Sequence, residues 1–462
     1  MLFFCLGVIV DTCAGVILAA GRSVRMKSKV PKVLHQVAGR EVIRYVADAI
    51  SATGVAPLVV VAAPSEASLL EILGPVFLFV TQSEPLGTAH ALWQAASLLQ
   101  GKTQHVLVVH GDTPLISPQS LEGVRQIHQR EHAAVTLLTC VTNQPEGLGR
   151  ILRSDSGRIQ AIVEEKEATA AQKAIQEVNA AVYCFRAEWL WANLHCVPQS
   201  PVGEYYLTDL VALAVQSGQP VASFTSDHAE EALGINTRLQ LAQAEAIVRQ
   251  RIREKWMLNG VTMVHPPTTF IDHDVSLGSD TIIFPNTFIL GRSVIGEDCL
   301  IGPNSTIVNS IIGNGCKIVG SVVEGSRIED GVDVGPFSHI RPESHIEVGV
   351  HIGNFAEIKK SRLGSGTKMG HFSYVGDATV GKEVNIGAGT ITCNYDGVQK
   401  YETLIGDRAF IGSDSLLIAP VEVGADAVTG AGAVVNHNVP ADSLAVGVPA
   451  RILKKKRREG TS

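Results

Sequence analysis

The sequence has few of the features that mark disulfide-stabilised, zinc-binding or nucleic-acid-binding proteins. Its 8 cysteines form no CxxC pair and show no paired spacing, which argues against both a zinc site and a disulfide framework. Cationic residues are not in excess, because 38 Lys and Arg stand against 45 Asp and Glu, and the net charge of -7 favours neither nucleic-acid nor membrane binding. We therefore expect a cytoplasmic protein that holds anionic ligands by local contacts.

Long apolar runs are also absent. No stretch reaches the ~18 apolar residues that a membrane-spanning helix needs. The start, MLFFCLGVIVDTCAGVILAAG, has the apolar character of a secretion signal, but no Lys or Arg precedes the run and Asp11 interrupts it. We interpret it as a short extension before a buried strand at about 15–20.

The length of 462 residues and a hydrophobic content of 45% favour at least two domains, each with its own core. From Val16 to about Ala222, apolar runs such as PLVVVAA and HVLVVHGD alternate with helical stretches such as VIRYVADAISAT, as in a mostly parallel, doubly wound α/β sheet. A largely polar linker helix is predicted over 238–256, and its apolar face comprises Leu241, Ala244, Val248 and Ile252.

After Asn259 the helical pattern gives way to aliphatic residues spaced six apart, many of them followed directly by Gly. This period fits one short strand and one corner, so three hexads close a triangular coil with a stacked aliphatic core. The positions are Ile271, Leu277, Ile283, Ile289, Ile295, Ile301 and Ile307; then Ile328, Val334, Ile340, Ile346, Ile352 and Ile358; then Ile405, Ile411, Leu417 and Val423.

One segment near the N-terminus has the composition of a phosphate-binding loop. The sequence LAAGRSVRMKSKVPK, from Leu18 to Lys32, places a strand end, a turn at Gly21 and a cationic stretch in succession. Backbone N–H groups at such a turn bind phosphate, and Arg25 and Lys32 add positive charge. By itself the segment is equally compatible with an ordinary strand-to-helix turn.

Further motifs decide between these interpretations: QSEPLGTAHA, HGDTPLIS, GLGRI, IVEEK, EVN, GEYYLTDL and GIN follow in order. With them the opening resembles sugar nucleotidyltransferases. From about Gly15 to Pro449 the chain is similar to the bifunctional bacterial enzymes that fuse an N-acetylglucosamine-1-phosphate uridylyltransferase to a glucosamine-1-phosphate acetyltransferase. The resemblance implies a Rossmann-like α/β nucleotidyltransferase domain over 1–238, a linker helix over 239–259 and a left-handed parallel β-helix of hexapeptide repeats over 260–462.

In the first domain, the resemblance implies that Asp112 and Asn236 coordinate Mg²⁺, for which hard oxygen ligands are suited. Asn236, before the linker helix, is also a candidate helix cap. The reaction implied is in-line attack of a sugar 1-phosphate oxygen on the α-phosphorus of UTP, which needs no side-chain nucleophile. The residues implied to bind UTP or UDP-N-acetylglucosamine are Leu18, Ala19, Ala20, Gly21, Arg25, Lys32, Gln82, Gly87, Thr88, Gly149, Glu164, Asn179 and Asn236.

In the second domain, the motifs RPES, NFAEIKKS, GHFSYVGDA and NIGAGTITCNYDG place polar residues within the hexads, which indicates a site. Acetyl transfer requires a base for the sugar amine, and a His with a pKa of about 6.5 is suited to this task. The resemblance gives His371 this role and implies that Glu357 orients it. It also implies sugar-phosphate contacts by Arg341, Lys359, Tyr374 and Asn385, and acetyl-CoA contacts by Ala388, Asn394, Tyr395, Ser413 and Ala431.

Some positions depart from the family pattern. Ser23 and Val24 stand where a Gly and a Thr are usual, and a β-branched residue does not readily adopt positive φ, so the phosphate loop is expected to differ in shape. Ala181 stands where Gly is usual. A coenzyme-binding Arg is missing near Gly447, and either Arg451 or the basic run at 454–458 is a candidate substitute, although such a run is usually a solvated tail.

The resemblance further implies a homotrimer with acetyl-transfer sites between subunits, and a product, UDP-N-acetylglucosamine, that feeds bacterial cell-wall and lipopolysaccharide synthesis. The departures motivate one alternative, an acetyltransferase with a weakened or re-specialised nucleotidyltransferase domain. A second alternative is a non-catalytic scaffold, against which the joint presence of Asp112, Asn236, His371 and Asn394 argues. A third, a translation-factor regulator of the same architecture, would lack GHFSY and CNYDG.

Overall fold

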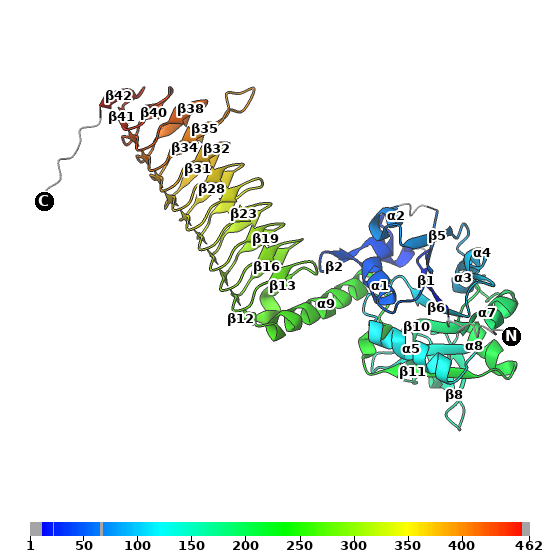
Figure 1. Cartoon of the computed structure of the whole chain (residues 1–462). Helices are drawn as coiled ribbons and strands as arrows, with labels where there is room; N and C mark the ends of the chain where they lie inside the picture. Colours follow the sequence, from blue (N-terminus) through cyan, green and yellow to red (C-terminus); the bar gives the residue numbers. More distant parts are fainter. Residues whose placement is uncertain (1–11, 22, 65–67, 455–462) are drawn as a thin grey trace, which may run out of the picture. The chain divides into compact units, whose positions relative to one another are not determined.

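The computed structural model describes residues 12–21, 23–64 and 68–454 (Figure 1). Its contacts divide the chain into two compact units, Met1–Val248 and Arg249–Ser462. The division falls within the long helix α9 (Arg238–Leu258). Most of the signal-like run, 1–11, and the end of the basic run, 455–458, lie outside the described residues. None of the helices within the described ranges combines the length and apolarity needed to cross a membrane.

The first unit is built on a mixed, mostly parallel sheet with the order β11-β7-β10-β6-β1-β4-β5, extended by β8 and β9. Strand β10 runs antiparallel to both of its neighbours, and β1 lies between β4 and β6. The predicted apolar runs form the central strands. The strands are β1 (Cys13–Leu18), β4 (Leu58–Ala62), β5 (Phe77–Thr81), β6 (His105–His110), β7 (Val135–Val141), β8 (Arg150–Arg153), β9 (Ile159–Val163), β10 (Glu177–Arg186) and β11 (Val221–Ser226), with the small hairpin β2 (Gln36–Val37) and β3 (Arg40–Glu41) apart.

Helices cover both faces of this sheet, because alternate residues of each strand point to opposite sides and both sides are apolar. One core packs α1, α2 and α5 against residues such as Ile17 and Val60. The other packs α3, α4, α7 and α8 against residues such as Val16 and Val59. The helices are α1 (Val42–Ser51), α2 (Ser68–Leu73), α3 (Thr88–Gln94), α4 (Ala96–Leu99), α5 (Pro118–Arg130), α6 (Ala170–Lys173), α7 (Ala187–Asn193) and α8 (Asp209–Gln216), with 3₁₀ turns η1 (Val24–Met26), η2 (Lys32–Leu34), η3 (Leu194–Cys196) and η4 (Ala229–Ala232).

The predicted linker helix is confirmed as α9. On its predicted apolar face, Ala244, Val248 and Ile252 are buried, whereas Leu241 is half-buried. The bounds predicted for the domains differ from the contact division, because the first eleven residues of α9, 238–248, belong to the first compact unit.

The second unit is a left-handed parallel β-helix, visible in Figure 1 as a stack of triangular coils. Each coil contributes one short strand to each of three parallel sheets, and the strands of successive coils pair in register, as Ile283 does with Ile301. A 3₁₀ turn, η5 (Pro266–Thr268), lies in the first coil, and the last strand, β42, folds back antiparallel to β41.

The first sheet contains β12 (Thr262–Met263), β15 (Ile282–Ile283), β18 (Leu300–Ile301), β21 (Lys317–Ile318), β24 (Asp333–Val334), β27 (His351–Ile352), β30 (Lys368–Met369), β33 (Asn385–Ile386), β36 (Phe410–Ile411), β39 (Val428–Thr429), β41 (Ser443–Val446) and β42 (Arg451–Lys454). The second contains β13 (Thr269–Ile271), β16 (Thr287–Leu290), β19 (Thr306–Val308), β22 (Val322–Glu324), β25 (His339–Ile340), β28 (Ala356–Lys359), β31 (Ser373–Gly376), β34 (Ile391–Cys393), β37 (Leu416–Ile418) and β40 (Val434–Val435). The third contains β14 (Ser276–Leu277), β17 (Val294–Ile295), β20 (Ile311–Ile312), β23 (Arg327–Ile328), β26 (His345–Ile346), β29 (Arg362–Leu363), β32 (Ala378–Val380), β35 (Thr403–Ile405) and β38 (Val421–Val423).

The hexad positions named from the sequence all face the core of the β-helix, and none of them is more than 7% exposed. The packing between coils explains the glycines that follow many of these positions. A Cβ on Gly278 would lie 2.5 Å from the backbone of the next coil, at Gly296 and Glu297. These corners therefore exclude side chains because adjacent coils stack too closely.

Candidate functional site

The first candidate site lies where the strand order of the α/β sheet reverses. From β1 the chain continues through β4 and β5 on one side and returns to β6 on the other, so β1 and β6 are adjacent at the switch point. Leu18 pairs with His110, and the N–H of Gly111 donates to the carbonyl of Leu18 at 2.9 Å. The predicted residues 18–21 and Asp112 thus lie together beyond the carboxyl ends of two parallel strands, which is where ligands bind in open α/β sheets.

Lys32 joins the two predicted magnesium ligands. Its Nζ forms an ion pair with Asp112 Oδ2 and donates to Asn236 Oδ1 at 3.0 Å. Asp112 is 8% exposed, and the N–H of Ile235 donates to its backbone carbonyl at 2.8 Å, which holds the GIN segment against the end of β6. Burial opposes ionisation of Asp112, but the charges of Lys32 and His110 outweigh it and lower the pKa of Asp112.

The donor set of this cluster fits a hard divalent cation, because a carboxylate oxygen and an amide oxygen already converge on one cationic nitrogen. By contrast, no group of three or more His, Cys, Asp or Glu residues in the described ranges has metal-site geometry. The described cysteines are free thiols. Asn236 is not the cap of α9 that was weighed from the sequence, because Thr237 directly precedes this helix and its Oγ1 accepts from the N–H of Gln240 at 3.2 Å.

The two residues of the loop after β1 that depart from the family pattern, Ser23 and Val24, carry no backbone strain. Ser23 has φ −85°, Val24 begins the 3₁₀ turn η1, and neither adopts a positive φ. Ser23 Oγ accepts from the N–H of Lys32 at 2.7 Å, so its hydroxyl helps to fix the predicted phosphate-binding lysine. Arg25 is exposed on the same turn. The expected difficulty of a β-branched Val at positive φ therefore does not arise, and the alternative of a weakened first domain is not favoured.

Gln82, Gly87 and Thr88 come together at the start of α3. Gln82 is 4% exposed and its Nε2 donates to the carbonyl of Gly87 at 3.1 Å. Gly87 has φ +106°, and a Cβ there would lie 2.4 Å from the carbonyl oxygen of Tyr205. Thr88 Oγ1 accepts from the N–H of Leu207 at 2.9 Å. These three residues thus connect the β5–α3 loop to the GEYYLTDL segment.

Gly149, Glu164 and Asn179 form a second group on the same unit. A Cβ on Gly149 would lie 3.7 Å from both Glu164 Oε1 and Asn179 Cβ, and the N–H of Asn179 donates to the carbonyl of Gly149 at 2.9 Å. Burial raises the pKa of Glu164, although Thr208 Oγ1 donates to it at 3.3 Å. Asn179 Nδ2 also donates to Tyr183 Oη at 2.6 Å.

The second candidate site follows the edge of the β-helix between β25 and β37. Glu357 and Tyr374 are register partners on β28 and β31, and Lys359 pairs with Gly376 two residues further along the same strands. Arg341 directly follows β25, and its Nη1 donates to Glu357 Oε1 at 2.8 Å. The predicted sugar-phosphate residues on these three coils therefore share one face.

Two of the predicted residues are not joined to this group. His371 is exposed after β30, and among the described residues no hydrogen bond links it to Glu357, whose carboxylate is paired with Arg341 instead. Asn385 lies on β33 in the first sheet, where it pairs with Lys368 and Phe410. The single chain therefore assembles only part of the groove expected from the sequence.

Asn394 begins the loop between β34 and β35, and it is 7% exposed. Its Nδ2 donates to Asp377 Oδ2 and lies 3.5 Å from Tyr374 Oη. Tyr395, the next residue, is exposed and donates from its hydroxyl to the carbonyl of Gly397 at 2.6 Å.

The small residues predicted to contact acetyl-CoA stack at one corner of successive coils. The N–H of Asp414 donates to the carbonyl of Ala388 at 2.7 Å, and that of Gly432 donates to the carbonyl of Ser413 at 2.8 Å. Ala431 precedes Gly432, so the three small residues form a column along the β-helix. Near the missing arginine, Gly447 has φ +100°, and Arg451 and Lys454 are exposed on β42.

Several polar residues of both sites were not predicted from the sequence. In the first, His110 Nε2 is buried without a hydrogen-bond partner among the described residues, and burial lowers the pKa of His110. In the second, Asp377 lies against Asn394, and Lys400 approaches Lys359, which lowers the pKa of Lys400. The HGD and VGDA motifs contained His110 and Asp377 as signals, but only contacts distant in sequence show what they touch.

Comparison with known families defines the class of protein. Residues 15–253 match the MobA-like NTP transferase domain. Residues 274–309 match the bacterial transferase hexapeptide (six repeats), and residues 403–437 match the hexapeptide repeat of succinyl-transferase. A nucleotidyltransferase domain and a hexapeptide transferase β-helix are thus combined in one chain.

Full-length relatives carry the same combination. The chain is 49% identical over 432 residues to the bifunctional protein GlmU of Heliobacterium modesticaldum, covering 93% of this chain and 94% of that protein. It is 51% identical over 413 residues to that of Pelotomaculum thermopropionicum (88% and 90% covered) and 44% identical over 441 residues to that of Streptococcus equi subsp. zooepidemicus (95% and 96% covered). The chain therefore belongs to the family of bifunctional GlmU proteins.

Proposed function

We propose that this chain is a bifunctional enzyme of UDP-N-acetylglucosamine synthesis. It acetylates glucosamine 1-phosphate with acetyl-CoA and then transfers UMP from UTP to N-acetylglucosamine 1-phosphate, releasing pyrophosphate. The observation that carries this proposal is similarity over 93% of the chain to the bifunctional protein GlmU of Heliobacterium modesticaldum. The convergence of Lys32, Asp112 and Asn236 at the switch point supports it.

For uridylyl transfer, the attacking sugar phosphate is already anionic, so the site needs to position two phosphate groups and to neutralise their charge. Lys32 and Arg25 supply positive charge beside residues 18–21, whose backbone binds the nucleotide. Gln82, Gly87 and Thr88 complete the uridine site, while Gly149, Glu164 and Asn179 hold the sugar. Mg²⁺, when bound by Asp112 and Asn236, neutralises charge on the triphosphate.

For acetyl transfer, His371 accepts a proton from the sugar amine as the amine nitrogen attacks the thioester carbonyl carbon. The carbon–sulfur bond then breaks, and His371 returns the proton to the sulfur, so that coenzyme A leaves as its thiol. Arg341 and Lys359 bind the sugar phosphate, with Tyr374 and Asn385 as further sugar contacts. Ala388, Asn394, Tyr395, Ser413 and Ala431 bind acetyl-CoA. The column that the small residues form at successive corners supports this assignment.

The substrates are small molecules, and we propose a cytoplasmic homotrimer that binds neither nucleic acid nor membrane. Trimerisation accounts for the partial groove of the single chain, because a neighbouring β-helix would complete it. In the completed groove, Glu357 would orient His371. The predicted bounds, 1–238 for the uridylyltransferase, 239–259 for the linker and 260–462 for the acetyltransferase, remain part of this proposal.

The test is an assay of purified protein with glucosamine 1-phosphate, acetyl-CoA, UTP and Mg²⁺ that measures free thiol and pyrophosphate separately. A parallel reaction supplies N-acetylglucosamine 1-phosphate directly. We expect both products from the wild type, with His371→Ala abolishing thiol release and Asp112→Ala abolishing pyrophosphate release in the parallel reaction. Thiol without pyrophosphate in both reactions would contradict the uridylyl half, and absence of both products would contradict the whole proposal.

A further inference from the structure

Asp377 occupies a corner of the β-helix that is fixed from several directions. It lies between β31 and β32 with φ +48°, a conformation that Asp and Asn tolerate better than most residues. Its N–H donates to the carbonyl of Lys359 at 3.0 Å, and its carbonyl accepts from the N–H of Thr403 at 3.1 Å. The backbone of Asp377 is therefore held by the coils on both sides, and its side chain projects from a rigid point.

The carboxylate of Asp377 determines how the amide of Asn394 is oriented. A carboxylate only accepts hydrogen bonds, so the Nδ2 of Asn394 faces it, and this is the contact present. The hydroxyl of Tyr374 lies 3.5 Å from the same Nδ2. Both neighbours occupy the nitrogen end of the amide, so the carbonyl Oδ1 of Asn394 points away from them and keeps its acceptor capacity for another donor.

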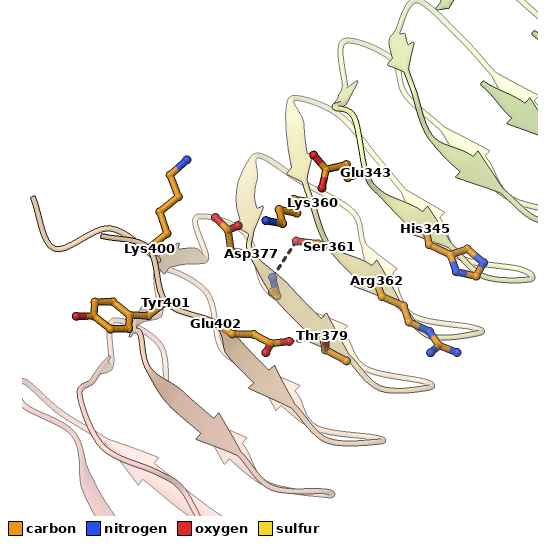
Figure 2. A pocket seen from close by; sticks show the side chains of 11 residues that line it. Glu343, His345, Lys360, Ser361, Arg362, Asp377, Thr379, Lys400, Tyr401 and Glu402 are labelled. Atoms are coloured by element: carbon orange, nitrogen blue, oxygen red, sulfur yellow. Dashed lines mark hydrogen bonds between the residues drawn. The ribbon is translucent and has the colours of Figure 1, made fainter. Parts of the chain in front are cut away.

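The negative charge of Asp377 also acts on a cation of this site. Lys359 approaches Lys400 and lowers the pKa of Lys400, while the negative charge of Asp377 acts in the opposite direction. In Figure 2, Asp377 lines the same cavity, of about 530 Å³, as Lys360 and Lys400. Asp377 thus contacts the predicted coenzyme residue and lies beside the predicted phosphate residue.

We propose that Asp377 is a positioning residue for acetyl transfer, which orients the amide of Asn394 so that its Oδ1 accepts a hydrogen bond from an N–H group of a bound substrate. The inference rests on the proposed acetyltransferase function. The donor is either the amine of the sugar phosphate or an amide of the coenzyme arm. Both groups are N–H hydrogen-bond donors, and the substrate whose KM changes in the variants identifies the donor.

The first variant is Asp377→Asn, which keeps the shape and the tolerance of positive φ. An Asn at this position presents an oxygen or a nitrogen equally well, so Asn394 is free to turn over. We expect kcat/KM for thiol release to fall about 10- to 100-fold, the range for loss of a hydrogen bond to a charged group. The matched control is Asp298→Asn, at another corner with φ +56°, which should leave both activities unchanged.

A charge exchange provides the decisive comparison. Asn394→Asp alone places two carboxylates in contact, and we expect a larger loss than that of Asp377→Asn. The double variant, Asp377→Asn with Asn394→Asp, restores a donor opposite an acceptor and leaves a carboxylate oxygen pointing toward the substrate. Its kcat/KM for thiol release should be at least about tenfold higher than that of Asn394→Asp, which is the effect expected of one such hydrogen bond.

Uridylyl transfer by the same samples is the internal control, because it belongs to the other compact unit. A loss confined to thiol release, with a raised KM for one substrate or a lowered kcat, supports the positioning role. Unchanged kinetics of Asp377→Asn, no recovery in the double variant, or a loss of both activities with a lowered unfolding temperature would each overturn it. A wild type that releases pyrophosphate but no thiol would overturn the proposed acetyltransferase function itself.

Discussion

Gly87→Ala should separate the two activities of the chain. Gly87 has φ +106°, which an L residue rarely adopts, and its missing Cβ would lie 2.4 Å from the carbonyl oxygen and 2.6 Å from the nitrogen of Tyr205. Neither atom belongs to a flexible side chain. The backbone at Tyr205 must therefore move by about 1 Å to restore an ordinary van der Waals separation.

The cost follows from what this movement breaks. The N–H of Ala89 donates to the carbonyl of Tyr205 at 3.0 Å, and the N–H of Tyr205 donates to the carbonyl of Leu86 at 2.8 Å. Two hydrogen bonds at about 1 kcal/mol each and a strained φ at about 1–3 kcal/mol give a loss of about 3–5 kcal/mol in the free energy of unfolding of the first unit. For a unit of this size, about 2–4 °C per kcal/mol gives an unfolding temperature about 6–20 °C lower.

Differential scanning calorimetry and the two product assays test this expectation on one sample. Pyrophosphate release should fall because the β5–α3 loop no longer meets the 200–208 segment, whereas thiol release should persist because it belongs to the other compact unit. Gly101→Ala is the matched control: its φ is +72° and no atom lies within 4 Å of the added Cβ, so only the strain applies. The reasoning would be refuted if Gly87→Ala had the same unfolding temperature and the same KM for UTP as the wild type.

Three further changes have expected outcomes. Ala181→Gly should raise the free energy of unfolding by about 1 kcal/mol in urea titration, because Ala181 has φ +58° and glycine removes that strain; an unchanged midpoint would contradict this. Burial raises the pKa of Glu164, so ionisation of this carboxyl above pH ~5 destabilises the folded, ligand-free protein. Glu164→Gln should therefore raise the unfolding temperature at pH 8 but not at pH ~4. Burial, with the nearby charges of His105 and Arg186, lowers the pKa of His128 to about 3. As the pH falls from about 6.5 toward 3, His128 therefore binds a proton in the unfolded chain but not in the folded protein, which lowers the free energy of unfolding by about 1.4 kcal/mol per pH unit. His128→Gln should remove this loss from the acid-unfolding profile.

The β-helix could be predicted almost completely from the sequence, because each of its coils repeats one local rule. An aliphatic residue every six positions is sufficient to place a side chain in the core, and Ile340 and Ile411 follow this rule in different coils. The sequence does not reveal why glycine is needed at the corners of the coils. Their proximity to the next coil depends on the stacking of segments about eighteen residues apart, which a single hexad does not reveal.

The candidate sites were predicted less evenly, because they depend on contacts between distant residues. The motifs predict Asp112 and Asn236 as metal ligands, but the ion pair between Lys32 and Asp112 joins residues 80 apart. Asp377 is similar: it sits in a recognised motif, yet its role rests on a contact with Asn394 across a coil. Sequence patterns thus identify which residues carry chemistry, while their partners follow only from the fold.

The departures from the family pattern illustrate the same distinction at the level of the backbone. Val24 is the more conspicuous change, but it occupies a 3₁₀ turn that any residue adopts, and the adjacent Ser23 hydroxyl binds the N–H of Lys32. Ala181 is a smaller change in chemistry, yet it carries a positive φ at the irregularity of β10, where its N–H donates to Asn179 Oδ1 at 3.1 Å. Among the residues that depart from the family pattern, the positive φ therefore lies beside a predicted sugar contact and not at Ser23 or Val24. Any catalytic consequence of these departures should accordingly appear in the KM for N-acetylglucosamine 1-phosphate and not in that for UTP.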